Sequence, residues 1–172
     1  GAKYDSGEYA MNLAEALKLV DYAGLRAEQA RRRASGDSKL LGIGVATYVE
    51  ICGFGPWESG TVTVGEDGKV TVLTGTSPHG QGHETAWAQL ASGILQIPME
   101  DIVVKHGDTA VIKRGIGTFG SRSAPVGGSA VYRNSETVRN KAIDIAAHLL
   151  EAASADVVLQ DGKFQVVGSP SS

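Results

Sequence analysis

A glycine-spaced run with two histidines and a glutamine is the first stretch that could bind a ligand. Its residues are His79, Gly80, Gln81, Gly82 and His83. Glycine has no β-carbon, so the backbone there can turn through positive φ and let a ligand approach its N–H groups. The Gln81 amide both donates and accepts, which suits a planar polar ring. The run predicts a binding loop, and the simpler alternative is a turn that only links two elements.

A second candidate stretch combines small residues, hydroxyl groups and one guanidinium. It is Gly120, Ser121, Arg122 and Ser123, directly before a predicted helix. Arginine offers a forked pair of donors to an anion, and the start of a helix adds free N–H groups. The alternative is that the serines are ordinary helix caps.

The two histidines are weak candidates for a metal site. His79 and His83 would share one face only if a helix ran through Gly80 and Gly82, which glycine disfavours. We therefore predict no protein metal ligand, and we expect His83 to contact a ligand oxygen or to pack against the loop. No nucleophile triad or acid–base pair of carboxylates is evident, so no catalytic residue is assigned.

Three charged residues lie near these stretches, at the ends of predicted elements. They are Glu50, Asp108 and Arg114. We interpret each as a surface charge or a loop fastener rather than a catalytic group.

The elements that must position the two stretches follow from periodicity. Residues 70–74 form a predicted strand before the first stretch and 83–95 a helix after it, and a long helix runs from Pro125 to about Ala153. The remaining predicted strands are 40–51, 61–64, 101–106, 157–159 and 164–167, with Asp-Gly turns in two hairpins.

The order from Gly60 onward predicts an α+β fold. It has a mixed sheet with helices packed on one face, a β-β-α-β-α-β core in which both loops reach the same edge. Two amphipathic helices, 9–20 and 21–34, broken near Gly24, precede it. The predicted organisation is an N-terminal helical segment, 1–39, and an α+β cofactor-binding domain, 40–172.

Composition excludes several classes of protein. The chain has 172 residues, 42% of them hydrophobic, and a net charge of −3, which argues against a protein whose main role is to bind nucleic acid. No apolar run reaches the roughly 20 residues of a transmembrane helix. Cys52 is the only cysteine, so a reducing, cytoplasmic location is predicted. The absence of an initiator Met indicates a piece of a longer protein.

Several motifs in order carry a resemblance to a known family. They are Thr74-Gly75-Thr76, the run from Gly80 to Thr85, Gly107-Asp108-Thr109, the run from Gly117 to Ser123, and Gly42-Ile43-Gly44 leading to Glu50. Together they resemble the large subunit of molybdenum hydroxylases, the xanthine dehydrogenase and aldehyde oxidase family. The similarity is greatest to the carbon monoxide dehydrogenase large-chain type and covers nearly the whole chain.

The resemblance implies a cofactor and the residues that bind it. The cofactor would be molybdopterin, usually as its cytosine dinucleotide in bacteria. Gly80 and Gln81 would contact the pterin with His79 and Gly82 beside them, and Gly120, Ser121 and Ser123 would bind the pyranopterin and its phosphate. The candidate set is completed by His83 and Arg122. Molybdenum would be held by the cofactor's own sulfurs.

The resemblance also implies a reaction and partners. Water-derived oxygen would be added to carbon monoxide, an aldehyde or a heterocycle, and electrons would pass to iron-sulfur and FAD centres on partner subunits. The intact enzyme would be a dimer of heterotrimers that includes the rest of the large subunit.

The chain also departs from the family pattern. The family's glutamate motif and active-site loop lie outside the chain, and the surroundings of Cys52 do not match that loop, so the isolated chain is not expected to catalyse. The alternatives are a stand-alone nucleotide- or phosphate-binding module and, more weakly, a structural or assembly domain.

Overall fold

The computed structural model describes residue 4 and residues 6–168. It divides the chain into a first unit, Gly1–Val49, and a second unit, Glu50–Ser172. This division falls ten residues after the boundary predicted from composition, because the segment that follows Lys39 is assigned to the first unit.

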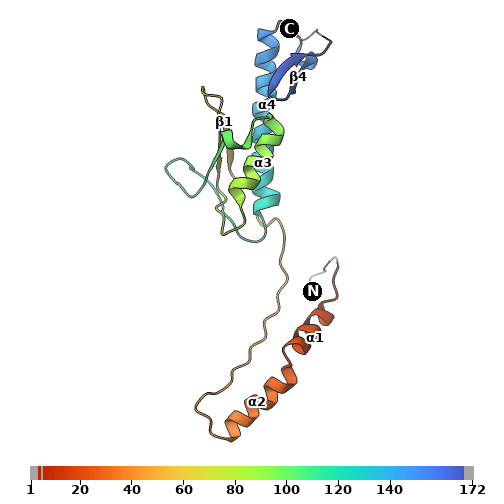
Figure 1. The fold of residues 1–172 in the computed structure, drawn as a ribbon, viewed down its shortest axis with the longest axis vertical. Coiled ribbons are helices and arrows are strands. Elements are labelled where there is room, and N and C mark those ends of the chain that lie inside the picture. The colour runs from red at the N-terminus through yellow and green to blue at the C-terminus, as the bar shows by residue number, and fades with distance from the viewer. Residues whose placement is uncertain (1–3, 5, 169–172) are drawn as a thin grey trace. The chain divides into compact units, whose positions relative to one another are not determined.

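The first unit contains two helices, α1 (Tyr9–Leu19) and α2 (Tyr22–Ala34), as predicted (Figure 1). They are separated at Asp21, which adopts the left-handed conformation with φ of 47° and accepts a hydrogen bond from the Gly24 N–H. The expected break near Gly24 is therefore wrong in position, because Gly24 lies inside α2.

The strand predicted over residues 40–51 is not formed within the described chain. This stretch contains no strand residue and belongs to no sheet of the described chain. Its Ile, Val, Tyr and Thr favour extended backbone, but a strand also needs a second strand to receive its hydrogen bonds. The residues described here supply none.

The second unit is built on a three-stranded sheet in the order β1-β2-β3. Strands β1 (Gly60–Val64) and β2 (Val70–Thr74) are antiparallel, and β3 (Ile102–Lys105) is parallel to β2. The turn between β1 and β2 is closed by a hydrogen bond from the Gly68 N–H to the Gly65 carbonyl, 3.0 Å. The hairpin and the mixed sheet are confirmed.

Two helices cover one face of this sheet. Helix α3 (His83–Leu95) connects β2 to β3 with the short 3₁₀ turn η1 (Met99–Asp101), and α4 (Ser129–Leu149) follows a π-helical turn, η2 (Ser123–Gly128). The long predicted helix is confirmed, although its first turn is π-helical and it ends four residues before Ala153.

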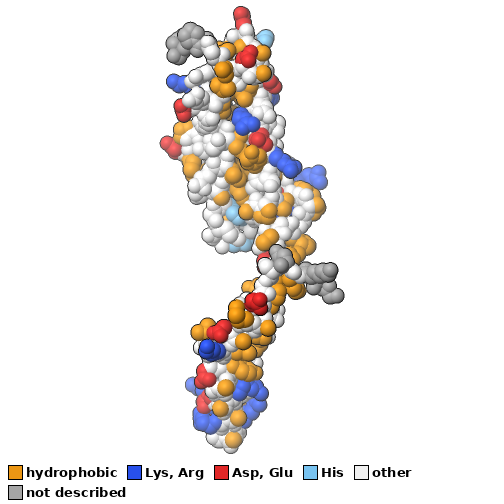
Figure 2. Space-filling view, turned by 90° about the vertical axis from the view of Figure 1, so that its right-hand side faces the viewer, with side chains coloured by type: hydrophobic (Ala, Val, Ile, Leu, Met, Phe, Trp, Pro, Cys, Tyr) orange, Lys and Arg blue, Asp and Glu red, His pale blue; other side chains and the backbone are white. Residues whose placement is uncertain are grey.

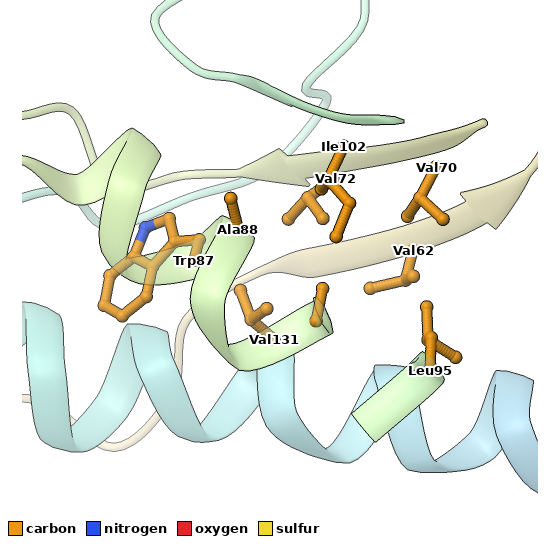
Figure 3. Packing of buried hydrophobic residues seen from close by; sticks show 9 residues of the cluster. Val62, Val70, Val72, Trp87, Ala88, Leu95, Ile102 and Val131 are labelled. Carbon is orange, nitrogen blue, oxygen red and sulfur yellow. The ribbon is translucent and has the colours of Figure 1, made fainter. Parts of the chain in front are cut away.

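A single hydrophobic core joins the sheet to α3 and α4 (Figure 3). The buried residues come from all three strands and both helices, so the α+β class is confirmed. They are Val62, Val70, Val72, Trp87, Ala88, Ala91, Leu95, Ile102 and Val131.

The C-terminal hairpin forms a sheet of its own. Strands β4 (Val157–Gln160) and β5 (Lys163–Val166) follow the 3₁₀ turn η3 (Ser154–Asp156), and among the described strands they pair only with each other. Val157 packs on Ala146 and Ala147 near the end of α4. The hairpin is confirmed, but it does not extend the main sheet as the predicted core implied. Within the described residues, no helix is long and apolar enough to span a membrane.

Candidate cofactor-binding site

One cavity of about 550 Å³ lies where the two predicted loops meet. We call residues 75–82, between β2 and α3, the first loop, and residues 117–122, before η2, the second loop. The cavity volume is in the range of small-molecule sites. Its lining residues are His79, Gln81, His83, Ala86, Trp87, Thr118, Phe119, Gly120, Ser121, Arg122, Ser123 and Ala124. The predicted convergence of the loops is therefore present in the fold.

The first loop presents unpaired backbone donors. Gly80 and Gly82 have φ of 98° and 72°, which residues with a β-carbon rarely adopt. Neither glycine lines the cavity, but no heavy atom lies within 4 Å of where a β-carbon would stand on either. Among the described residues, no backbone carbonyl accepts from the N–H groups of residues 80–83.

The Gln81 side-chain amide uses its oxygen in a hydrogen bond within the loop. Its Oε1 accepts a hydrogen bond from the His79 N–H, which closes the loop on itself. The amide nitrogen has no such partner in the described chain, and the side chain is exposed. Gln81 can therefore donate to a molecule in the cavity.

His83 begins α3 and is buried, with its ring stacked on Trp87 at a centroid distance of 5.3 Å and an interplanar angle of 26°. Burial lowers the pKa of His83, so the imidazole is neutral at pH 7. Its Nδ1 has no hydrogen-bond partner among the described residues. An unpaired buried nitrogen is unfavourable, and a ligand or water beside the ring would relieve that cost.

A short chain of buried hydrogen bonds fixes the first loop to the core. Trp87 Nε1 donates to the Thr76 hydroxyl at 3.2 Å, and this hydroxyl lies 2.9 Å from that of Thr74. Gly127 must be small, because a β-carbon there would lie 2.7 Å from Thr76 Cγ2. The loop, α3 and η2 are thus held in one position relative to each other.

The second loop pairs with residues 53 and 54 by backbone hydrogen bonds. The Gly53 N–H donates to the Ser121 carbonyl at 3.1 Å, and the Phe54 N–H donates to the Gly120 carbonyl at 3.3 Å. The Ser121 hydroxyl donates to Glu50 at 3.0 Å. The N–H groups of Gly120 and Ser121 donate to no backbone carbonyl in the part of the chain that is described.

We expect Gly120→Ala to destabilise the second loop. Gly120 has φ of 55°, and a β-carbon there would lie 2.8 Å from Phe54 Cβ. Strain and overlap together should cost about 1–3 kcal/mol of unfolding free energy, measured by urea denaturation. Gly68→Ala is the control, since Gly68 also has positive φ, 80°, but no heavy atom within 4 Å of where its β-carbon would stand. Equal losses in both variants would contradict a role for the contact with Phe54.

The Arg122 guanidinium is fully buried and bonded within the protein. Its Nε donates to the Phe54 carbonyl at 2.6 Å, and its terminal nitrogens donate to Glu58 and to the carbonyls of Gly117 and Trp57. The predicted free fork for an anion is therefore not present. Arg122 lines the cavity but acts by holding the second loop to residues 54–58.

Glu58 is the partner that sequence reasoning missed. Its carboxylate contacts Arg122 at 2.5 Å and accepts from the N–H groups of Ser59, Ile116 and Gly117. Burial alone would raise the pKa of Glu58, but these hydrogen bonds outweigh it and the pKa is lowered. No periodic signal marks Glu58, because its partners lie up to 64 residues away.

The three flanking charges act as fasteners. Glu50 accepts from Ser121, Asp108 accepts from the Ala110 N–H at 2.8 Å, and the Arg114 guanidinium lies 5.2 Å from the centre of the Trp57 ring. This agrees with the interpretation of all three as structural.

The described acidic and histidine side chains do not form a metal centre. Glu84, beside His83, is paired with His106 at 2.8 Å, and its pKa is lowered first by its own backbone N–H and then by that histidine. Within the described residues, no group of three or more His, Cys, Asp or Glu side chains is arranged to hold a metal ion.

Residues 15–172 match the model of the molybdopterin cofactor-binding domain. The chain belongs to this family. The match includes both loops and every residue that lines the cavity.

Proteins similar to this chain include the large subunits of two different enzymes. The chain is 40% identical to the carbon monoxide dehydrogenase large chain of Hydrogenophaga pseudoflava and 34% identical to the nicotine 6-hydroxylase large subunit of Paenarthrobacter nicotinovorans. The matches cover 99% and 100% of this chain, but only 23% and 22% of those subunits. The chain therefore spans about a quarter of the length of the relatives it matches.

Solved structures agree with the fold. A crystal structure of the Cu,Mo carbon monoxide dehydrogenase matches 98% of this chain with a TM-score of 0.67 and 36% identity. Quinoline 2-oxidoreductase from Pseudomonas putida 86 matches with a TM-score of 0.63, also at 36% identity. The matches cover 23% and 22% of those chains.

Proposed function

We propose that the cavity between the two loops holds part of the molybdopterin cofactor of a molybdenum-dependent hydroxylase. The observation that carries this proposal is that two stretches separated by about forty residues line one cavity in a domain of the cofactor-binding family. The residues of the chain hold and orient the cofactor at this site.

Backbone donors are the first feature that suits this ligand. The unpaired N–H groups of residues 80–83 stand at the start of α3, and those of Gly120 and Ser121 stand just before η2. Helix starts favour anions, so phosphate oxygens are suitable partners here. The Ser121 and Ser123 hydroxyls lie on the same rim; they donate to Glu50 and Thr118, and each can rotate to donate to a ligand instead.

Polar and aromatic side chains supply the second feature. Gln81 offers its amide nitrogen, and His79 flanks it on the cavity wall. The neutral His83 and the Trp87 ring behind it form a flat, weakly polar wall against which a planar ring can pack. Arg122 does not touch the cofactor in this proposal; its guanidinium keeps the second loop in place.

The whole enzyme is inferred from the relatives. When bound, the cofactor supplies the redox chemistry of hydroxylation, in which oxygen from water is added to a substrate. Iron-sulfur and flavin subunits as electron acceptors, the cytosine dinucleotide form of the cofactor, a dimer of heterotrimers and a cytoplasmic location remain predictions.

The test is cofactor content in the full-length large subunit that carries these residues. The double variant Gln81→Ala, Ser121→Ala should lower cofactor affinity by about tenfold or more, because each lost hydrogen bond is worth about 1 kcal/mol. Molybdenum is measured by mass spectrometry and pterin by fluorescence after oxidation.

The control variant replaces one serine and one glutamine outside the cavity with alanine. Ser154→Ala with Gln165→Ala changes two exposed side chains near the C-terminal hairpin and should leave occupancy unchanged. Full occupancy in the Gln81, Ser121 variant would contradict the site. Nucleotide or phosphate binding by the 172-residue chain together with an absence of molybdenum in the full subunit would favour the stand-alone module.

A further inference from the structure

The described part of the first unit has apolar surface but no hydrophobic core. Among its described residues, Gln29 is the only buried side chain. Figure 2 shows hydrophobic side chains along the surface of this unit, which is the red and orange ribbon of Figure 1. Large apolar residues with at least 37% exposure are Tyr4, Tyr9, Met11, Leu13, Leu19, Val20, Leu40, Val45, Tyr48 and Val49. Two helices without a buried apolar side chain bury too little area to offset the entropy of ordering the chain.

The segment from Leu40 to Val49 has the composition of an interior β-strand, but no strand lies beside it in the described chain. It contains no charged residue and carries Ile43, Val45, Thr47 and Val49 at alternate positions. Within the described chain, no backbone N–H or carbonyl of this segment bonds to another backbone group. Edge strands that stay exposed usually carry charges or proline, and this one carries neither.

A groove runs between this segment and α1. It has a volume of about 530 Å³ and is lined by residues 46–49 on one side and by Tyr9, Leu13 and Ala16 of α1 on the other. These three helical residues share the apolar stripe of α1. A strand beside residues 46–49 would place its side chains against that stripe.

We propose that residues 40–49 form a strand of a β-sheet whose other strands come from large-subunit sequence outside these 172 residues. The partner is an open strand edge with apolar side chains, and α1 covers the resulting sheet. This inference rests on the proposed function only in taking the chain as part of a longer large subunit.

The length of the relatives supports this choice of partner. This chain spans 23% of the Hydrogenophaga large chain, so most of such a subunit lies outside the match and is available to supply the sheet. An uncharged strand with apolar residues on both faces is typical of a sheet covered on both sides. Gly42 and Gly44 allow another backbone to lie close against this one.

Amide hydrogen exchange tests the pairing directly. In the full-length large subunit, amides of residues 43–49 should exchange about 100-fold more slowly than in the 172-residue chain, because paired amides exchange only through opening. Amides of β2 provide the internal reference, since they are paired in both proteins. Equal, fast exchange of 43–49 in both proteins would overturn the proposal.

A second copy of the chain is the competing occupant. Protection of residues 43–49 that rises with the concentration of the 172-residue chain, together with a dimer in sedimentation experiments, would replace the proposed partner by a second copy. Protection confined to the full-length subunit supports the proposal.

Proline variants give an independent test. Val45→Pro and Ala46→Pro remove N–H groups on alternate sides, and at least one should abolish protection of the segment in the full-length subunit. Glu66→Pro is the control, because Glu66 occupies the second position of the tight turn between β1 and β2, where proline fits. If both variants retain full protection, the segment is not paired. Cofactor content is read separately: normal content without strand protection would contradict only this inference.

Discussion

Glu58→Ala is expected to destabilise the second unit by about 3–5 kcal/mol, the cost of leaving one member of a buried ion pair without its partner. The Glu58 and Arg122 side chains are both fully buried and in contact at 2.5 Å. The same carboxylate accepts from the backbone N–H groups of Ile116 and Gly117. Its loss therefore also leaves the backbone at the start of the second loop without these hydrogen bonds. Urea denaturation of the 172-residue chain measures the change in unfolding free energy.

Two further variants separate the pair from a general charge effect. Glu28→Ala removes a partly exposed carboxylate paired with Arg31 and Arg32 in α2, and should cost far less unfolding free energy than Glu58→Ala because water screens this pair. Glu58→Gln keeps the size and one of the two acceptor oxygens but removes the charge, so its loss of unfolding free energy should be smaller than that of alanine. A loss below about 1 kcal/mol for Glu58→Ala would show that Arg122 holds the loop without this partner.

The Glu58 carboxylate should make the second unit less stable as pH falls. The pKa of Glu58 lies below its ordinary value of 4.5 in the folded protein, chiefly because hydrogen bonds from the Gly117 N–H and Arg122 outweigh the effect of burial. Its stabilisation is therefore complete above about pH 4.5 and is lost as pH falls through the lower, folded pKa. The Glu58→Gln variant should lack this part of the acid-induced loss.

Trp87→Ala is the second change expected to have a large effect, about 3–5 kcal/mol of unfolding free energy. Trp87 is 3% exposed and packs in the core between the sheet, α3 and η2. A β-carbon on Gly128 would lie 3.0 Å from its ring, which shows how closely the two elements meet there. The indole also stacks on His83, so cofactor content should fall in the full-length subunit.

Two matched variants refine the tryptophan test. Trp57→Ala removes a side chain that is 40% exposed and should cost about 1 kcal/mol, mainly its contact with Arg114. Trp87→Phe keeps most of the ring but loses the hydrogen bond to Thr76, which is worth about 1 kcal/mol. If Trp87→Ala and Trp57→Ala were equally mild, the core would not depend on the indole.

Local patterns determined most of the fold in advance. The Asp-Gly turns, the alternation in β2 and the periodicity of α3 and α4 depend on near neighbours, so the sequence could indicate these elements and the α+β class. The motif around Gln81 and the later run to Ser123 indicated the cofactor family. The sequence also indicated the free N–H groups of the first loop, because Gly80 and Gly82 favour a backbone that turns through positive φ there.

Interactions between distant residues were decided only by the tertiary structure. The sequence predicts Arg122 as an anion ligand, but the fold brings Glu58 and three carbonyls to it, and all three guanidinium nitrogens are hydrogen-bonded within the protein. The sequence predicts a strand over residues 40–51, but pairing requires a second strand that the described chain does not provide. In both cases the sequence specifies what a side chain or backbone can bond to, and only three-dimensional proximity decides which partner it meets.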